Sequence, residues 1–259
     1  HIEMSEVDGV VFGAGGGVGF ECVQHMLSKG QRVRAVVRSP QKYADKFPKD
    51  PKLTIAQGDV TNLESVREVI KGAKGVIFAA SGTTFWSAAS VDFQGAKNVA
   101  DAATQEQRVV LVSSALVSPK NRLNPIRIIL NNFRWSLMDN KFKGECALRD
   151  SGKSFTVVRP GHLVNEPSGQ HRLITGKQGR SWSTQWPHEM PICWLVLCQG
   201  DGKLPGAVSR ADVAAVCVAA ITATAADKIT FELGADKSQG AAQGPIADIF
   251  SGLKQGVYQ

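Results

Sequence analysis

The sequence predicts an α/β fold in which helices cover both faces of one doubly wound parallel sheet. Through the first 160 residues, short apolar runs alternate with segments of helical periodicity, a pattern typical of strands joined by crossover helices. Each run is rich in Val, Ile and Phe at consecutive positions, as strands buried on both faces require. The predicted strands are Val7–Phe12, Val33–Val37, Leu53–Ala56, Gly75–Ala80, Val109–Ser113 and Phe155–Val158, with a late strand at Ile229–Leu233.

The starts of the helices between these strands are indicated by residues that favour helix N-termini. The first predicted helix, Gly17–Lys29, directly follows a glycine-rich turn. Capping pairs predict three later starts, at Thr61 with Glu64, at Asn124 with Pro125, and at Ser209 with Asp212. The Asn124 helix has apolar residues at helical spacing as far as Leu137 and is expected to continue through Lys141.

All 259 residues are predicted to form a single domain, because no linker-like stretch divides the chain. Residues 161–206 interrupt the βα alternation and are rich in Gly, Pro, Ser, Trp and His. We therefore expect them to form a small irregular cap on the substrate side of the sheet. Trp182, Trp186 and Trp194 in this segment are candidates either for an apolar pocket or for core packing.

The composition is that of a soluble globular protein, with 43% hydrophobic and 20% charged residues. No apolar run approaches the roughly 20 residues that a transmembrane helix needs, so no such segment is predicted. The net charge of +7 is concentrated in residues 31–49 and 117–149. Because no nucleic-acid-binding module accompanies these cations, they favour a phosphate-binding cleft and a solvated face over nucleic-acid contact.

The cysteines indicate neither a disulfide framework nor a metal site. No two form a CxxC pair, and none has the Cys/His spacing of a zinc site. We therefore predict reduced thiols and no metal ligands. The five residues are Cys22, Cys146, Cys193, Cys198 and Cys217.

The glycine-rich run after the first predicted strand is the sharpest functional signal in the sequence. It contains the pattern GxxGxxG at Gly13, Gly16 and Gly19, between a strand and a helix. Glycines there permit a tight turn, close approach of a diphosphate, and close helix–strand packing. The next helix directs its positive N-terminus at the diphosphate, so a bound dinucleotide is predicted. The residues assigned to this contact are Gly13, Gly15, Gly16, Gly17, Val18 and Gly19.

The end of the second predicted strand indicates which dinucleotide binds. A protein that prefers NAD normally has an acidic residue here, which accepts a hydrogen bond from the adenosine 2′-hydroxyl. This chain has Arg38 and Ser39 instead, with Lys42 close behind. An arginine can hold a 2′-phosphate through two charge-assisted hydrogen bonds, so we predict NADP(H). The alternative is that Arg38 is simply a surface arginine.

Residues that follow the third and fourth predicted strands complete the expected adenosine and diphosphate contacts. Asp59 and Val60 follow the third strand, where a carboxylate can bind the adenine amino group. Asp59 could equally be a turn residue. Ala79, Ala80 and Ser81 follow the fourth strand, where small side chains allow the backbone to lie near the ribose and diphosphate.

Together with the segments Gly58–Val60, Ser113–Ser114 and Val158–Gly161, the glycine run and Arg38 resemble the atypical short-chain dehydrogenase/reductases. The resemblance is strongest to NmrA-like NAD(P)-binding proteins, and it covers roughly residues 5–235. Residues 141–145, 148–152 and 209–214 look like those of chloroplast and cyanobacterial members. The resemblance implies a Rossmann fold, a plastid location, and further cofactor contacts at Ser113, Lys141, Pro160 and Gly161.

In the enzymes of this superfamily, a lysine and a tyrosine four residues before it serve the reaction, and a serine holds the substrate oxygen. Lys141 matches the lysine and Ser114 the serine, and these two are the candidate catalytic residues. Leu137 stands where the tyrosine would be, and a leucine has no proton to transfer. His162 is a candidate replacement acid, although a lone loop histidine is more often structural or exposed.

Arg127, Arg134 and Lys141 are spaced by seven and would share one face of a continuous helix. Such a basic stripe could dock an acidic partner or steer an anionic substrate, or it could be a solvated face. Two hypotheses about function therefore remain. The chain is either a non-catalytic NADP(H)-binding accessory subunit that binds a partner through its cap or basic stripe, or a reductase of a quinone, an enone or a similar acceptor.

Overall fold

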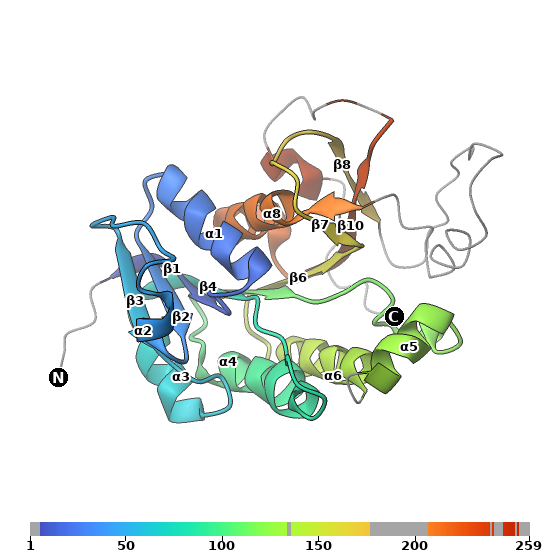
Figure 1. Cartoon of the computed structure of the whole chain (residues 1–259), viewed down its shortest axis with the longest axis horizontal. Coiled ribbons are helices and arrows are strands. Elements are labelled where there is room, and N and C mark those ends of the chain that lie inside the picture. The colour runs from blue at the N-terminus through green and yellow to red at the C-terminus, as the bar shows by residue number, and fades with distance from the viewer. Residues whose placement is uncertain are drawn as a thin grey trace.

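The structure is a computed structural model and describes residues 6–133, 136–176, 207–238, 240, 246–251 and 253. In these residues eight strands form one sheet, in the order β3-β2-β1-β4-β5-β6-β10-β8 (Figure 1). All neighbours pair in parallel except β8, which lies antiparallel to β10 at the edge. The strands are β1 Val7–Phe12, β2 Val33–Val37, β3 Leu53–Gln57, β4 Ala73–Phe78, β5 Arg108–Val112, β6 Phe155–Pro160, β8 Arg172–Gly176 and β10 Ile229–Asp236. The predicted doubly wound parallel sheet is confirmed.

The chain changes direction across the sheet next to β1, and this change positions the glycine run. The chain runs outward from β1 through β2 to β3, then returns to form β4 on the other side of β1. Phe12 at the end of β1 is aligned with Val36 of β2 and with Phe78 of β4. Ligands of such sheets bind beyond the carboxyl ends of the strands at this topological switch point.

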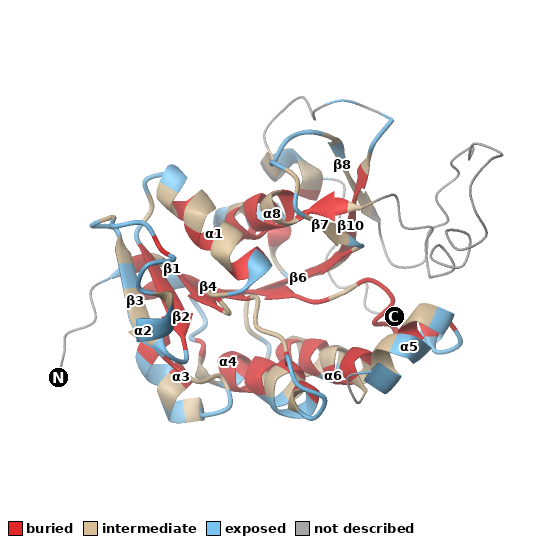
Figure 2. Ribbon diagram, in the orientation of Figure 1, coloured by how far each residue is buried: buried red, intermediate tan, exposed pale blue. Residues whose placement is uncertain are grey.

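Helices cover both faces of the sheet, as expected (Figure 1). On one face lie α1 (Gly17–Ser28) and α8 (Arg210–Thr222), which pack against each other. On the other face lie α3 (Leu63–Ile70), α4 (Ala96–Ala102) and α6 (Leu137–Asp150). The sheet between them is mostly buried, which explains why its strands are apolar at consecutive positions (Figure 2).

Each face of the sheet has its own apolar core. Met26 of α1 and Val216 of α8 belong to the first cluster and are completely buried. Val99 of α4 and Leu148 of α6 belong to the second, on the opposite face. Removal of this apolar surface from water is the main favourable contribution to folding.

The described residues also form shorter helices. They are α2 Pro40–Tyr43, α5 Pro125–Phe133, the π-helix η1 Ala89–Gly95, and the 3₁₀ helices η2 Pro119–Asn121, η3 Thr224–Ala226 and η4 Ile246–Phe250.

The predicted capping box of Thr61 and Glu64 is wrong, because α3 begins one residue later. Asn62 is its N-cap, and the Asn62 Oδ1 atom accepts a hydrogen bond from the backbone N–H of Ser65 at 3.0 Å. The Thr61 hydroxyl instead donates to Asp59 at 2.8 Å. The turn that Asp59 forms therefore moves the helix start away from Thr61.

Replacing Asn62 with alanine is expected to lower the free energy of unfolding by about 1 kcal/mol, since one N–H of the first turn of α3 loses its acceptor. Thr61→Ala should cost less than about 0.5 kcal/mol, because it removes only an exposed hydroxyl. Urea denaturation of both variants measures the difference. A larger loss for Thr61→Ala than for Asn62→Ala would contradict the assignment of the cap.

The single helix predicted from Asn124 through Lys141 is in fact two helices, α5 and α6 (Figure 1). Ser136, just before α6, has a left-handed backbone with φ of 58°. The Asn131 Oδ1 atom accepts the backbone N–H of Met138 at 2.8 Å and so caps the start of α6. Apolar spacing continues across this break, which is why the sequence pattern indicated one helix.

The predicted basic stripe is also wrong, because its residues lie on two separate helices and Arg127 is buried. The Arg127 side chain pairs with Asp139 at 2.6 Å and is 6% exposed. Arg134 lies outside the described residues. Lys141 lies on α6, so Arg127 and Lys141 do not share one helix face.

The C-terminal part of the predicted domain extends the sheet. The Ser209 hydroxyl accepts the backbone N–H of Asp212 at 2.9 Å, which confirms Ser209 as the cap of α8. Within the predicted cap 161–206, β7 (Leu163–Val164) pairs with β9 (Val208–Ser209), and β8 joins the main sheet. Residues 177–206, with all three tryptophans of the expected cap, lie outside the described residues. In the described part of the chain, no helix has the length and apolar character needed to cross a bilayer.

Candidate dinucleotide-binding site

The glycine run lies at the switch point and touches the end of β4. Gly13 has φ of +77°, and a Cβ atom there would come within 2.6 Å of the Ala80 backbone nitrogen. The Gly16 N–H donates to the Gly13 carbonyl at 2.9 Å, which closes the turn. A Cβ atom at Gly19 would collide with the same carbonyl. Only glycine therefore satisfies the backbone at Gly13 and Gly19.

The start of α1 has the properties of an anion-binding site. Gly16 is its N-cap and provides no side-chain acceptor, and the first turn contains no acidic residue. Gly16 and Gly17 are exposed, while Val18 is buried beneath them. The first N–H groups of a helix have no partner within the helix, and together with the helix dipole they favour a negatively charged group. The diphosphate of a dinucleotide is a negatively charged group of this kind.

The residues predicted to bind the 2′-phosphate are accessible to solvent. Arg38 and Ser39 directly follow β2 and are both exposed. Arg38 takes part in no ion pair or hydrogen bond recorded within the described residues. Its charge is therefore available at the strand end where an adenosine ribose is expected.

Two contacts on the adenosine side of the site were not predicted from the sequence. The Tyr43 ring of α2 lies directly against Gly15, and a Cβ atom on Gly15 would overlap it. Lys46 Nζ donates to the Gly15 carbonyl at 2.8 Å and lies 4.8 Å from the centre of the Phe20 ring. These contacts fix the glycine run against the segment after β2. The only sequence signal for them was the high density of cations in residues 31–49.

Asp59 and Val60 follow β3, as predicted, and both have structural contacts. The Asp59 carboxylate accepts the backbone N–H of Thr61 at 2.9 Å, so it forms the turn that was the alternative interpretation. The Val60 carbonyl accepts from the Asn98 side chain at 2.8 Å. Contact of Asp59 with adenine stays a prediction.

Lys141 is joined to the loop after β4 through a buried carboxylate. Its Nζ atom lies 2.9 Å from Asp92 Oδ1, and Asp92 Oδ2 accepts the Gly82 backbone N–H at 2.9 Å. Asp92 has a fully buried side chain on η1, a π-helix of a type often found at functional sites. Ala79, Ala80 and Ser81, just before Gly82, are partly exposed. Lys141 thus helps to hold the backbone that is predicted to contact the ribose and diphosphate.

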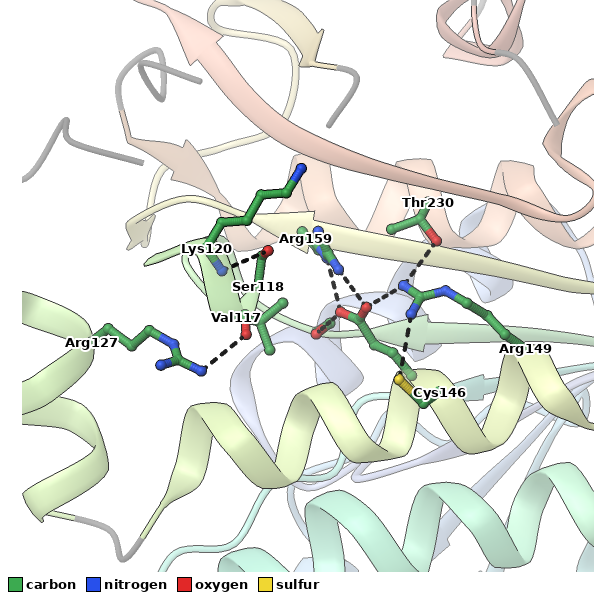
Figure 3. Close-up of polar contacts among 10 residues, drawn as sticks. Val117, Ser118, Lys120, Arg127, Cys146, Arg149, Arg159 and Thr230 are labelled. Carbon is green, nitrogen blue, oxygen red and sulfur yellow. Dashed lines mark hydrogen bonds and ion pairs between the residues drawn. The ribbon is translucent and has the colours of Figure 1, made fainter. Parts of the chain in front are cut away.

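Ser113 belongs to a buried ionic network centred on Glu145. The Ser113 hydroxyl donates to Glu145 at 2.5 Å, and Arg159 donates to both carboxylate oxygens at 2.9 and 2.6 Å. Arg149 donates to the same carboxylate and to Thr230. In Figure 3, dashed lines join Arg149 to Thr230 and to the neighbouring Cys146.

Glu145 is completely buried, and its environment favours the ionised form. Burial opposes ionisation, but Arg159, Arg149 and the Ser113 hydroxyl together hold the pKa of Glu145 below its ordinary value. Glu145 is one turn after Lys141 on α6, so both side chains point from α6 toward the interior. The network connects α6 to the ends of β5 and β6.

The remaining predicted residues lie at or just beyond the ends of β5 and β6. The Ser114 hydroxyl donates to the Ala115 carbonyl at 2.9 Å. Pro160 is buried, and Gly161 donates its N–H to the Leu233 carbonyl at 2.9 Å. His162 is exposed. Ser114 and Gly161 are partly exposed and could contact a ligand above the strand ends.

Leu137 is buried at the first position of α6, in a small cluster with Ala88 and Met138. No acidic or basic group replaces it one turn before Lys141. Of the two tyrosines, Tyr43 lies beside the glycine run and Tyr258 lies outside the described residues. In the described residues, no group of three or more His, Cys, Asp or Glu side chains could hold a metal ion.

Residues 13–189 match the model of a family described as NAD(P)H-binding. The chain is 36% identical over 170 residues to the chloroplast protein At2g34460 of Arabidopsis thaliana, a match that covers 61% of this chain and 59% of that protein. It is 30% identical over 183 residues to the chloroplast protein TIC 62 of Pisum sativum, covering 61% of this chain and 34% of the relative. The match thus spans less than two thirds of the length of either relative.

The fold is also similar to those of solved structures. The oxidoreductase ylbE from Lactococcus lactis superposes with a TM-score of 0.70, covering 96% of this chain and 95% of that protein at 14% identity. At this identity the likeness concerns the fold alone. The family match and the chloroplast relatives agree with the resemblance carried by the glycine run, Arg38 and residues 158–161.

Proposed function

Because the chain belongs to the NAD(P)H-binding family of atypical short-chain dehydrogenase/reductase-like proteins, we propose that it binds NADP(H) as a non-catalytic subunit. In this role it would act as an accessory or assembly subunit of a larger complex. The chloroplast location of its relatives makes a photosynthetic complex in a plastid the first candidate.

The observation that carries the non-catalytic role is Leu137. In the related enzymes, a tyrosine at this position exchanges a proton with the substrate oxygen, and the nearby lysine lowers the pKa of that tyrosine. Leu137 has no proton to exchange, and it is buried against Ala88. Lys141, which would assist the tyrosine, pairs with Asp92 instead. The site therefore retains the groups that hold a dinucleotide and lacks the usual acid.

The preference for NADP(H) is supported by Arg38. Its guanidinium is exposed at the end of β2, and a 2′-phosphate there would gain charge-assisted hydrogen bonds. The glycine run and the start of α1 would hold the diphosphate, and Ala79–Ser81 and Gly161 would approach the ribose and nicotinamide. When bound, NADPH would carry a hydride that can be donated.

A second candidate function is an NADPH-dependent reductase of a quinone, an enone or a similar acceptor. It is favoured by Lys141 and by Ser114, a partly exposed residue just after β5. An acceptor of this kind can take its proton from solvent, so the missing tyrosine does not exclude it.

Titration of the purified protein with NADPH and NADH, followed by nicotinamide fluorescence, tests the binding. The decay of bound NADPH with a panel of quinones and enones then tests turnover. Tighter binding of NADPH than of NADH, with no acceptor reduced above the rate of free NADPH, is expected. Turnover of any acceptor would replace the subunit role with the reductase, and absence of dinucleotide binding would overturn both.

A further inference from the structure

Arg210, the first residue of α8, lies beside the start of α1. A Cβ atom on Gly17 would come within 2.7 Å of both Cδ and Nε of Arg210. The two helices pack side by side on one face of the sheet (Figure 1). Because Gly17 has no side chain, the Arg210 side chain can lie across the N-terminus of α1. Gly17 thus provides space for a neighbouring cation as well as for a ligand.

The position of Arg210 is fixed by the residues around it. Its Nη1 atom donates to the Asn165 side chain at 2.7 Å. The start of α8 is held by Asp212, whose carboxylate accepts from the Ser168 hydroxyl at 2.7 Å and from the Gly169 N–H at 2.8 Å. The turn of Asn165 to Gly169 is therefore held against α8, and Arg210 is hydrogen-bonded to its first residue.

Among the described residues, no carboxylate neutralises the charge of Arg210. Its recorded acceptors are the neutral oxygens of Asn165 and Leu163, and it forms no ion pair with any residue in the described ranges. The side chain is partly exposed, next to the exposed Gly17. A positive charge at the positive end of α1 adds to the repulsion of cations there and to the attraction of anions.

We propose that Arg210 binds the diphosphate of the dinucleotide from the α8 side, beside Gly17 of the glycine run. The proposal rests on the proposed binding of a dinucleotide at this run. A guanidinium donates charge-assisted hydrogen bonds to phosphate oxygens in a fixed planar geometry. Because NAD(H) and NADP(H) share the diphosphate, Arg210 contributes equally to both, whereas Arg38 distinguishes between them.

The test compares Arg210→Gln with the wild-type protein for three ligands: NADPH, NADH and adenosine 2′-monophosphate, which lacks the diphosphate. The variant is expected to bind both dinucleotides about tenfold more weakly, by the same factor, because one charge-assisted contact is lost. Its affinity for adenosine 2′-monophosphate should equal that of the wild type. Arg210→Lys, which keeps the charge, should recover part of the loss.

Lys237→Gln is the matched control for a purely structural role. Lys237 pairs with Glu166 of the same turn at 2.8 Å, whereas the atoms nearest to a Cβ on Gly17 are those of Arg210. This variant also loses one positive charge, and it should bind all three ligands like the wild type. Unchanged dinucleotide affinity in Arg210→Gln, or equal weakening of all three ligands, would overturn the role of Arg210. Failure of the wild-type protein to bind either dinucleotide would instead overturn the proposed function.

Discussion

Replacing Glu145 with glutamine is expected to lower the free energy of unfolding by about 3–5 kcal/mol, because two arginines would lose the charge that compensates their burial. Arg159 is 1% exposed, and Glu145 is completely buried. Glutamine has nearly the same shape but only one oxygen acceptor and no charge. Most of the predicted loss therefore comes from the uncompensated guanidinium groups of Arg159 and Arg149. Urea denaturation followed by circular dichroism measures the change.

The matched control is Glu64→Gln, which removes the same charge from an exposed pair with Arg67 on α3. Its cost should be within about 0.5 kcal/mol, since exposed ion pairs contribute little. Equal costs for the two variants would contradict a stabilising role of the buried network. If Glu145→Gln does not fold at all, Ser113→Ala removes one neutral donor to the same carboxylate and should give a smaller, measurable loss.

The same network predicts how stability depends on pH. Because the pKa of Glu145 is lower in the folded protein than in the unfolded chain, its contribution is complete above its ordinary pKa of about 4.5. The contribution is lost as the pH falls through the lower folded-state pKa. The stability difference between wild type and Glu145→Gln should therefore stay constant from about pH 8 to pH 5 and shrink only in stronger acid. A difference that already shrinks near neutral pH would contradict this.

The sheet could be predicted from the sequence because its central strands are apolar on both faces. β5 is buried at every position from Val109 to Val112, so its burial appears in the sequence as an unbroken apolar run. Helix ends were harder, because single residues decide them. A left-handed Ser136 divides α5 from α6 although the apolar spacing continues. Because the Thr61 hydroxyl is hydrogen-bonded to Asp59, Asn62 rather than Thr61 caps the start of α3.

The glycine run could be predicted because its chemistry belongs to the backbone and is local in sequence. Contacts between distant segments could not. The link from Lys141 to Asp92 depends on the π-helix η1, which turns Asp92 inward, and no periodicity in the sequence indicates it. Glu145 and Arg149 have the spacing of an ordinary exposed helix pair, and the second partner of Glu145, Arg159 on β6, does not follow from that spacing.

Replacing Arg38 with glutamate is expected to weaken the binding of NADPH by about 100-fold or more, since two charge-assisted hydrogen bonds are lost and a repulsive carboxylate is introduced. Affinity for NADH should change by less than about threefold, because a carboxylate at this position can accept from the 2′-hydroxyl. Fluorescence titration with both dinucleotides measures the two affinities. The selectivity for NADPH should therefore reverse in this variant.

Arg32→Glu is the control, because it makes the same change of charge at the other end of β2. Arg32 is exposed and directly precedes β2, whereas Arg38 directly follows it. A strand of this length spans roughly 16 Å. That is about twice the distance over which physiological salt screens exposed charges, about 8 Å. Arg32→Glu should therefore leave the NADPH affinity nearly unchanged.

Equal losses of NADPH and NADH affinity in Arg38→Glu would mean that Arg38 supports the site as a whole and that the 2′-phosphate is held elsewhere. A loss confined to NADPH would assign the 2′-phosphate to Arg38, and would leave the diphosphate to the glycine run and Arg210.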